Sequence, residues 1–176
     1  MHVNSYELMC RMLSKFIIES RAYADDYSMR VLDVGSMDVR GIGSYKNMFT
    51  FDGIQKNWTY TGLDIEAGLN VDTVSPDPYN WPVADESYDV VISGQCMEHV
   101  EAPWLWVKEV ERVCKRGGFA FIIAPFYHPV HRFPVDCYRY VPDGFSYLFG
   151  KHCNFDVLET DVSNGMDTYV AARKRA

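Results

Sequence analysis

The stretch VLDVGSMDVRG, residues Val31–Gly41, decides the fold. It continues a short apolar run that begins at Met29 and ends in a glycine, Gly35. Such a run is typical of a parallel strand that is buried on both faces and turns sharply at its carboxyl end. Because glycine has no side chain, Gly35 permits the tight turn and lets a ligand approach the backbone. The stretch therefore predicts a buried strand over 29–35 with a binding site beyond its end.

Further runs along the chain repeat this pattern. Strands are predicted over Trp58–Ile65 (WTYTGLDI), Tyr88–Ser93 (YDVVIS) and Gly118–Pro125 (GFAFIIAP), with a weaker one over Leu69–Val74. The segment Ala102–Gly118 carries an apolar helical stripe, a proline in its first turn and paired glycines at its end, which predict a helix. Strands that alternate with helices indicate right-handed βαβ units and a parallel sheet covered on both faces.

The C-terminal part of the sequence changes to an antiparallel pattern. The segments Asn154–Ser163 and Asp167–Lys174 are joined by the turn-forming pair Asn164-Gly165 and predict a hairpin at the sheet edge. The predicted fold class is α/β, a Rossmann-like, doubly wound, mostly parallel sheet with an antiparallel C-terminal edge hairpin. The basic residues at the end are expected to form a solvated tail: Arg173, Lys174 and Arg175.

Length and composition restrict the class of protein. A chain of 176 residues fits a single domain, 1–176, whose first helix, within residues 1–28, packs on the sheet or forms a lid. The net charge of -7 and the pI near 5.1 argue against nucleic-acid binding, which needs cationic side chains. The five cysteines contain no CxxC pair, so we expect neither a disulfide framework nor a metal site. No signal peptide or membrane-spanning run is recognised, and a cytoplasmic location is expected.

The residues just after the predicted strands mark the binding site, because ligands of open parallel sheets bind beyond the carboxyl ends of the strands. Asp64 ends the second strand and is placed to accept hydrogen bonds from two ribose hydroxyls. A glycine turn followed by an acid also fits a dinucleotide site, but residues 36–38 read Ser-Met-Asp instead of the GxGxxG of a pyrophosphate loop. A carboxylate there repels phosphate, whereas Asp33 or Asp38 favours the sulfonium and ammonium groups of S-adenosylmethionine.

With these residues in place, the sequence resembles the class I S-adenosylmethionine-dependent methyltransferases, in particular the small bacterial members of the methyltransferase type 11 group. The resemblance covers Val31–Phe145 and rests on four ordered blocks: VLDVGSMDVRG, YTGLDIEAG, DPYNWPVADESYDVVISGQCMEHV, and the helix that ends in ERVCKRGGFAFIIAP. It implies the class I methyltransferase fold, S-adenosylmethionine as cofactor and methyl transfer as the reaction. Met37 and Val39 stand where the family has its second and third loop glycines.

The resemblance also implies which residues bind the cofactor. Asp33, Gly35 and Ser36 match positions at the methionine end of the cofactor, and Asp64 matches the acid that holds the ribose. Asp77 matches the acid that faces the adenine amino group. The full set implied is Asp33, Gly35, Ser36, Asp38, Gly41, Asp64, Ile65, Asp77 and Tyr79, with Ser93, Gln95 and His99 closing over or framing the pocket.

The stretch FYHPVHRFPVDCYRYVPDGF, Phe126–Phe145, combines histidines, charged residues and prolines directly after a predicted strand. Similar segments in relatives imply a part of the acceptor pocket. Where an acceptor must lose a proton, histidine is suited to take it near neutral pH. We expect His128 or His131 to be that base. Asp136 or Arg139 would orient the acceptor. The alternative is that these polar groups lock a proline-rich loop against the sheet.

These observations predict an S-adenosylmethionine-dependent methyltransferase that acts on a small-molecule acceptor, which the resemblance implies to be a sugar or a natural-product intermediate. An NAD(P)-dependent Rossmann oxidoreductase and a non-catalytic S-adenosylmethionine-binding protein remain alternatives. The acceptor atom is left open among oxygen, nitrogen and carbon. Since no inserted substrate domain is recognised, we expect either an open pocket or a lid supplied by the partner subunit of a homodimer, with the first helix as a candidate.

Overall fold

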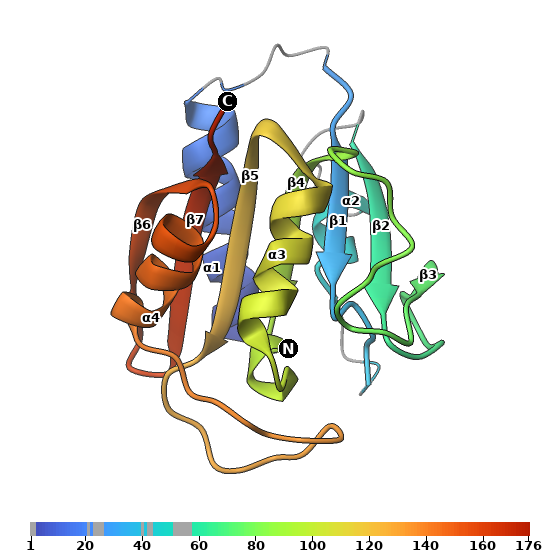
Figure 1. The fold of residues 1–176 in the computed structure, drawn as a ribbon, viewed down its shortest axis with the longest axis vertical. Helices are drawn as coiled ribbons and strands as arrows, with labels where there is room; N and C mark the ends of the chain where they lie inside the picture. Colours follow the sequence, from blue (N-terminus) through green and yellow to red (C-terminus); the bar gives the residue numbers. More distant parts are fainter. Residues whose placement is uncertain (1–2, 21, 23–26, 40, 42–43, 51–57) are drawn as a thin grey trace.

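A computed structural model describes residues 3–20, 22, 27–39, 41, 44–50 and 58–176 of the chain. Its strands form one seven-stranded sheet in the order β3-β2-β1-β4-β5-β7-β6 (Figure 1). The strands are β1 (Arg30–Val34), β2 (Thr59–Asp64), β3 (Thr73–Val74), β4 (Tyr88–Gly94), β5 (Cys114–Pro125), β6 (Phe155–Ser163) and β7 (Asp167–Lys174). Neighbours from β3 to β5 are parallel, and β7 is antiparallel to both β5 and β6. The predicted α/β class, with its antiparallel C-terminal hairpin, is confirmed.

Helices cover both faces of this sheet. Figure 1 shows α3 (Pro103–Val113) and α4 (Pro142–Tyr147) on one face and α1 (Val3–Leu13) and α2 (Lys46–Thr50) on the other. Shorter helical segments are η1 (Ser14–Glu19), η2 (Met97–His99) and η3 (Leu148–His152). A separate cluster of buried apolar side chains lies on each face. None of the helices in the described ranges is both long and apolar enough to cross a membrane.

The strand β5 shows why the central strands are apolar at every position. Phe119 and Phe121 belong to the buried cluster that includes α1 residues, whereas Ala120 and Ile122 belong to the cluster that includes α3 residues. Successive side chains of a strand point to opposite faces, so a strand covered on both faces needs apolar residues throughout. This is the physical reason why these runs were recognisable in the sequence.

Two details of the sequence prediction are wrong, and both concern the end of α3. The helix predicted to reach Gly118 ends at Val113, and Cys114 already has extended dihedrals and begins β5. The Lys174 side chain, predicted to be solvated, is buried and donates hydrogen bonds to the carbonyls of Glu111 (2.7 Å) and Cys114 (2.8 Å). A C-terminal lysine thus satisfies carbonyls that the end of α3 leaves without helical partners.

The first helix packs against the sheet beside the carboxyl ends of β4 and β5. Leu8 and Met12 are buried in the cluster on that face. The Ser5 hydroxyl donates a 2.9 Å hydrogen bond to Asp167, the first residue of β7. The Gln95 amide, just after β4, donates to the same Ser5 hydroxyl (3.2 Å) and to Asp167 (2.9 Å). A buried polar network therefore joins α1 to two strands at one end of the sheet.

Candidate active site

A cavity of about 680 Å³ opens at the carboxyl ends of β1, β2 and β4. Its lining includes Gly35 after β1, Asp64 at the end of β2 and Gln95 after β4. The loop after β5, residues 126–141, runs below these strand ends in Figure 1 and adds His128 and residues 131–135 to the lining. The cavity therefore lies where parallel sheets bind ligands, and its volume falls in the usual range of small-molecule sites.

Asp33 is a buried acid in the wall of this cavity. Its carboxyl is 2% exposed and accepts a 2.6 Å hydrogen bond from the Tyr60 hydroxyl. Burial raises the pKa of Asp33 to about 7, the hydrogen bond from Tyr60 opposes that rise, and the nearby Asp64 carboxylate adds to it. A cationic ligand group in the cavity would stabilise the charged form of Asp33.

The raised pKa of Asp33 predicts a pH dependence of stability. The carboxyl has a folded-state pKa of about 7 against 3.8 ordinarily, so between these values the folded chain keeps a proton that the unfolded chain releases. Stability from this group is therefore full below pH 3.8 and falls as the pH rises towards 7, by at most about 1.4 kcal/mol per pH unit.

Asp33→Asn should remove this contribution, because asparagine does not titrate. Urea unfolding of both proteins across this pH range should show the variant gaining stability relative to the wild type as the pH rises. The hydrogen bond from Tyr60 favours the charged form of Asp33, and its effect is already contained in the folded-state pKa of about 7. A difference that stays the same at every pH would contradict the prediction.

The loop after β1 is held by the last residues of β2. Gly35 has a left-handed φ of +76°, and a Cβ there would lie 2.6 Å from the Cβ and Sγ atoms of Cys96. The Asp64 carboxylate accepts hydrogen bonds from the backbone amides of Met37 (2.9 Å) and Ile65 (2.8 Å). Burial raises the pKa of Asp64, and these amide bonds oppose the rise. These contacts fix the conformation of the turn and hold the Asp64 carboxylate at the edge of the cavity.

Acidic groups predominate among the charged groups that line the cavity. The lining carboxyl groups are those of Asp33, Asp38, Asp64, Glu66 and Glu101. Arg132 is the only Lys or Arg in the described lining. Such a lining opposes a pyrophosphate and attracts a cation, since like charges repel and opposite charges attract over short distances. The residues present therefore fit the sulfonium and ammonium groups of S-adenosylmethionine.

Aromatic side chains form another part of the lining. The Tyr79 ring is half-buried, and its hydroxyl accepts a 2.9 Å hydrogen bond from the Ala102 amide. Trp81 and Trp106 also line the cavity and pack edge to face with ring centroids 5.6 Å apart. Tyr79 is the least buried of these three rings, and its flat surface suits a purine ring, which binds by stacking.

The structure brings most of the predicted cofactor residues to the cavity. Those that line it come from β1 and the loop after it, the end of β2, the segment between β3 and β4, and the segment after β4 that includes η2. They are Asp33, Gly35, Ser36, Asp38, Asp64, Ile65, Tyr79, Gln95 and His99. Of the predicted acceptor residues, His128 and His131 line the same cavity.

Three predicted cofactor residues lie outside the lining. The Ser93 hydroxyl is buried and donates a 2.6 Å hydrogen bond to the Val34 carbonyl, so it joins β4 to β1. The Asp77 carboxylate accepts from the Tyr79 amide at 2.8 Å and stabilises a turn. A Cβ on Gly41 would meet nothing within 4 Å, so this glycine does not lie against the other described residues. Arg40, in the same predicted loop, is outside the described residues.

Asp136 and Arg139 also lie outside the lining and form a bidentate pair. Two guanidinium nitrogens of Arg139 donate to the two carboxylate oxygens of Asp136 at 2.6 and 2.9 Å. The guanidinium holds the pKa of Asp136 well below its usual range. Arg139 donates further to the carbonyls of His128 and Pro129, and Asp136 accepts from the His131 amide. These contacts favour the alternative in which both residues lock the loop.

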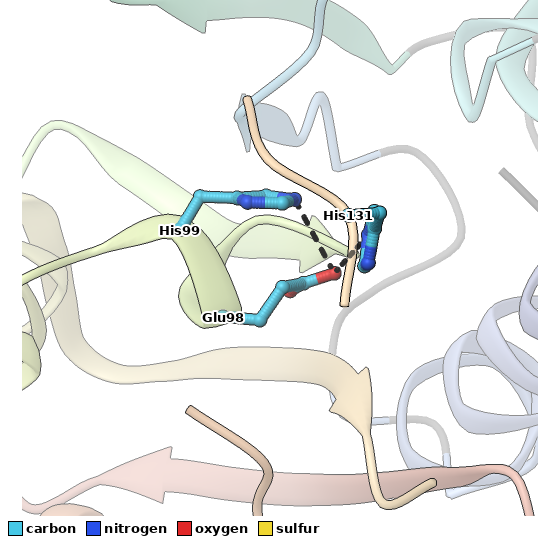
Figure 2. A group of neighbouring side chains, drawn as sticks. All are labelled: Glu98, His99 and His131. Carbon is cyan, nitrogen blue, oxygen red and sulfur yellow. Dashed lines mark ion pairs between the residues drawn. The ribbon is translucent and has the colours of Figure 1, made fainter. Parts of the chain in front are cut away.

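A group of titratable side chains lies at the loop side of the cavity, and Figure 2 shows three of its members. The His99 and His131 rings pack edge to face with centroids 4.9 Å apart, and the His128 ring lies 4.5 Å from that of His131. Behind them the Glu98 carboxyl is fully buried, and burial raises its pKa to about 8. The loop after β5 therefore meets η2 in a cluster of imidazoles around an acid.

Sequence reasoning missed Tyr45 as a member of this region. Tyr45 is buried in the lining, and its hydroxyl lies where a Cβ on Gly94 would be 2.0 Å away. No sequence pattern indicates that approach, because it depends on how the segment after the loop folds over β4.

An acidic cavity at the carboxyl ends of a mostly parallel sheet defines the class of Rossmann-like proteins that bind an adenosyl cation. The chain belongs to the methyltransferase-domain family, whose model matches residues 32–122. This match confirms the predicted family and its cofactor, S-adenosylmethionine. It covers β1 to β5, which are the strands that carry the cavity.

Individual relatives agree with this assignment. An uncharacterized methyltransferase of Mycolicibacterium gilvum is 29% identical over 107 residues, which are 54% of this chain and 38% of that protein. The chain thus matches well under half the length of that relative. A SAM-dependent methyltransferase of Aquifex aeolicus has a TM-score of 0.62 at 14% identity, with 98% of this chain and 99% of that one covered. The (4+2)-cyclase SpnF has a TM-score of 0.71 at 15% identity, with 97% and 81% covered. At these identities the two structures show the class I fold alone.

Proposed function

We propose that this protein transfers a methyl group from S-adenosylmethionine to a small-molecule acceptor, and that the acceptor is a sugar or a natural-product intermediate. The acidic cavity at the ends of β1, β2 and β4 carries the proposal, because its lining suits a cationic, phosphate-free adenosyl ligand. The family supports the reaction, and the resemblance to the methyltransferase type 11 group supports the acceptor class.

At the cofactor end, this chain supplies an acid, a backbone turn and an aromatic surface. The Asp64 carboxylate already accepts two backbone amides, and each of its oxygens has a second lone pair for a ribose hydroxyl. Gly35 leaves its backbone open to the methionine end, and Asp33 balances the positive charge there. When bound, the cofactor supplies an activated methyl group on a cationic sulfur. The residues act by holding that group in line with the acceptor.

At the acceptor end, His128 is the better candidate for the base. The Nδ1 atom of His131 faces the Pro129 carbonyl at 3.2 Å, and its Nε2 atom faces Glu98 at 3.7 Å, so both of its ring nitrogens already face acceptors. His128 lines the cavity from the same loop. It would take the proton that an acceptor hydroxyl or amine releases as the methyl group arrives.

Titration calorimetry with S-adenosylhomocysteine and with NAD tests the proposal. We expect micromolar binding of S-adenosylhomocysteine and no binding of NAD, since the acidic lining repels a pyrophosphate. Binding of NAD alone would support the oxidoreductase alternative and overturn the proposal. Acceptor screening with labelled cofactor is the second step. A chain that binds the cofactor but methylates no sugar or natural-product acceptor in the screen would be assigned to the non-catalytic alternative.

A further inference from the structure

Glu98 poses a physical problem that the proposed reaction does not explain. Its side chain is 0% exposed, and neither carboxyl oxygen has a hydrogen-bond partner among the described residues. A buried carboxyl whose oxygens lack a donor either keeps a proton or binds a cation, because an unpaired buried charge costs several kcal/mol. The buried oxygens of Glu98 are therefore candidate ligands for a cation.

Two histidines direct ring nitrogens at the same carboxyl oxygen. The Nε2 atoms of His99 and His131 each lie 3.7 Å from Oε1 of Glu98. Figure 2 shows the two rings converging on that oxygen, one from η2 and one from the loop after β5. One ligand atom of each residue lies within 4.8 Å of the others. This spacing leaves room for one ion at the centre.

The other nitrogen of each ring shows which tautomer is present. Nδ1 of His99 lies 2.6 Å from the Val135 carbonyl, and Nδ1 of His131 lies 3.2 Å from the Pro129 carbonyl. A carbonyl can only accept, so each neutral ring carries its proton on Nδ1 and presents a lone pair at Nε2. Both Nε2 lone pairs then face Oε1 of Glu98, an arrangement that a positive ion stabilises.

We propose that Glu98, His99 and His131 form a binding site for a divalent transition-metal ion such as zinc. Two imidazoles and one carboxylate are a ligand set that such ions prefer, and it leaves coordination positions open. With metal–ligand bonds of about 2.1 Å, tetrahedral ligands stand about 3.4 Å apart. The two 3.7 Å separations from Glu98 need to close by a few tenths of an ångström, and the third ligand pair, which lies within 4.8 Å, needs to close by up to about 1.4 Å.

The surroundings of the three ligands match those of known metal sites. Metal-bound histidines usually donate their second ring nitrogen to a carbonyl or carboxylate, which fixes the ring. Val135 and Pro129 supply these carbonyls, and Asp136 places a carboxylate oxygen 3.4 Å from Nδ1 of His131. The pairing of Asp136 with Arg139 then has a function, since it holds the loop that delivers His131.

The coordination positions that the three ligands leave open would face the cavity, because His99 and His131 both line the cavity. An acceptor with an oxygen ligand, such as a hydroxyl or carboxylate, could then be held beside the cofactor end. This consequence rests on the proposed function, whereas metal binding itself does not.

Titration of tag-free protein with Co²⁺ and Zn²⁺ tests the site directly. We expect one equivalent of Co²⁺ to bind with visible absorption bands of a low-coordinate ion, and Zn²⁺ to displace it. Glu98→Gln, His99→Asn and His131→Asn should each weaken binding by more than about 100-fold, beyond the ~10–100-fold that loss of an outer partner costs. His152→Asn is the matched control, because His152 is outside the cavity lining and bonds the Trp104 carbonyl.

Thermal unfolding supplies a second readout that does not depend on activity. Zn²⁺ should raise the unfolding temperature of the wild type and of His152→Asn but not that of Glu98→Gln. If Glu98→Gln does not fold, the two half-exposed histidine variants decide the question by the same titration. The proposal is wrong if the wild type takes up no stoichiometric ion, or if the folded ligand variants bind as the wild type does. Cofactor binding is measured separately, so failure of either proposal is recognisable.

Discussion

Replacing Asp64 by alanine should lower the affinity for S-adenosylhomocysteine by more than about 100-fold, because two charge-assisted hydrogen bonds are lost at about 1.5–3 kcal/mol each. The carboxylate lines the cavity and is held in place by the amides of Met37 and Ile65. Its orientation is therefore already set before a ligand arrives. Calorimetric titration measures the affinity, and circular dichroism checks that the variant is folded.

Asp72→Asn is the matched control for this variant. The Asp72 carboxylate also accepts a backbone amide, that of Gly62 at 2.8 Å, but it is outside the cavity lining. We expect its affinity for S-adenosylhomocysteine to stay close to that of the wild type. Asp64→Asn, which keeps one acceptor oxygen, should fall between the two. Equal affinities of the Asp64 and Asp72 variants would exclude Asp64 from the cofactor site.

Gly35→Ala should destabilise the fold by about 2–5 kcal/mol, the sum of a left-handed backbone cost of about 1–2 kcal/mol and an overpacking cost of about 1–3 kcal/mol. The left-handed φ of +76° disfavours any side chain, and the new methyl group would lie 2.6 Å from the Cβ and Sγ atoms of Cys96. Neither β1 nor β4 can move away cheaply, because both are central strands of the sheet. Urea unfolding measures the decrease in the free energy of unfolding. The affinity for the cofactor should also fall, because the substitution displaces the turn.

Gly165→Ala separates the two costs. Gly165 has a similar φ of +65°, but a Cβ there would meet nothing within 4 Å. Its substitution should therefore show the backbone cost alone, about 1–2 kcal/mol. If Gly35→Ala loses no more stability than Gly165→Ala, the turn relaxes around the new methyl group. Cys96 would then not constrain the turn.

The sequence predicted well those elements that depend on residues close to one another in the chain. The strands β1, β4 and β5 were recognisable because burial on both faces requires uninterrupted apolar runs, and the hairpin was recognisable from Asn164-Gly165. The burial of Lys174 was missed because its partner Cys114 lies 60 residues earlier in the chain. A local pattern contains no information about a partner that distant.

The same distinction applies to the candidate site. Asp33, Gly35 and Asp64 were predicted at the cavity because each lies at or next to the carboxyl end of a recognisable strand. Ser93 was implied as a cofactor residue by the resemblance to the family, whereas its buried hydroxyl donates a hydrogen bond to the Val34 carbonyl. The convergence of Glu98 and His131 was beyond prediction, since 32 intervening residues fold between them and the loop geometry decides their separation.

The place of β7 in the sheet has a consequence for synthesis on the ribosome. β7 lies between β5 and β6, so β5 gains its second neighbour only after residues 167–174 have left the exit tunnel. Until then the nascent chain presents the long edge of β5, with Phe119, Phe121 and Ile123, as a template for pairing with other chains. Slow or interrupted translation of the hairpin would therefore favour aggregation over completion of the sheet.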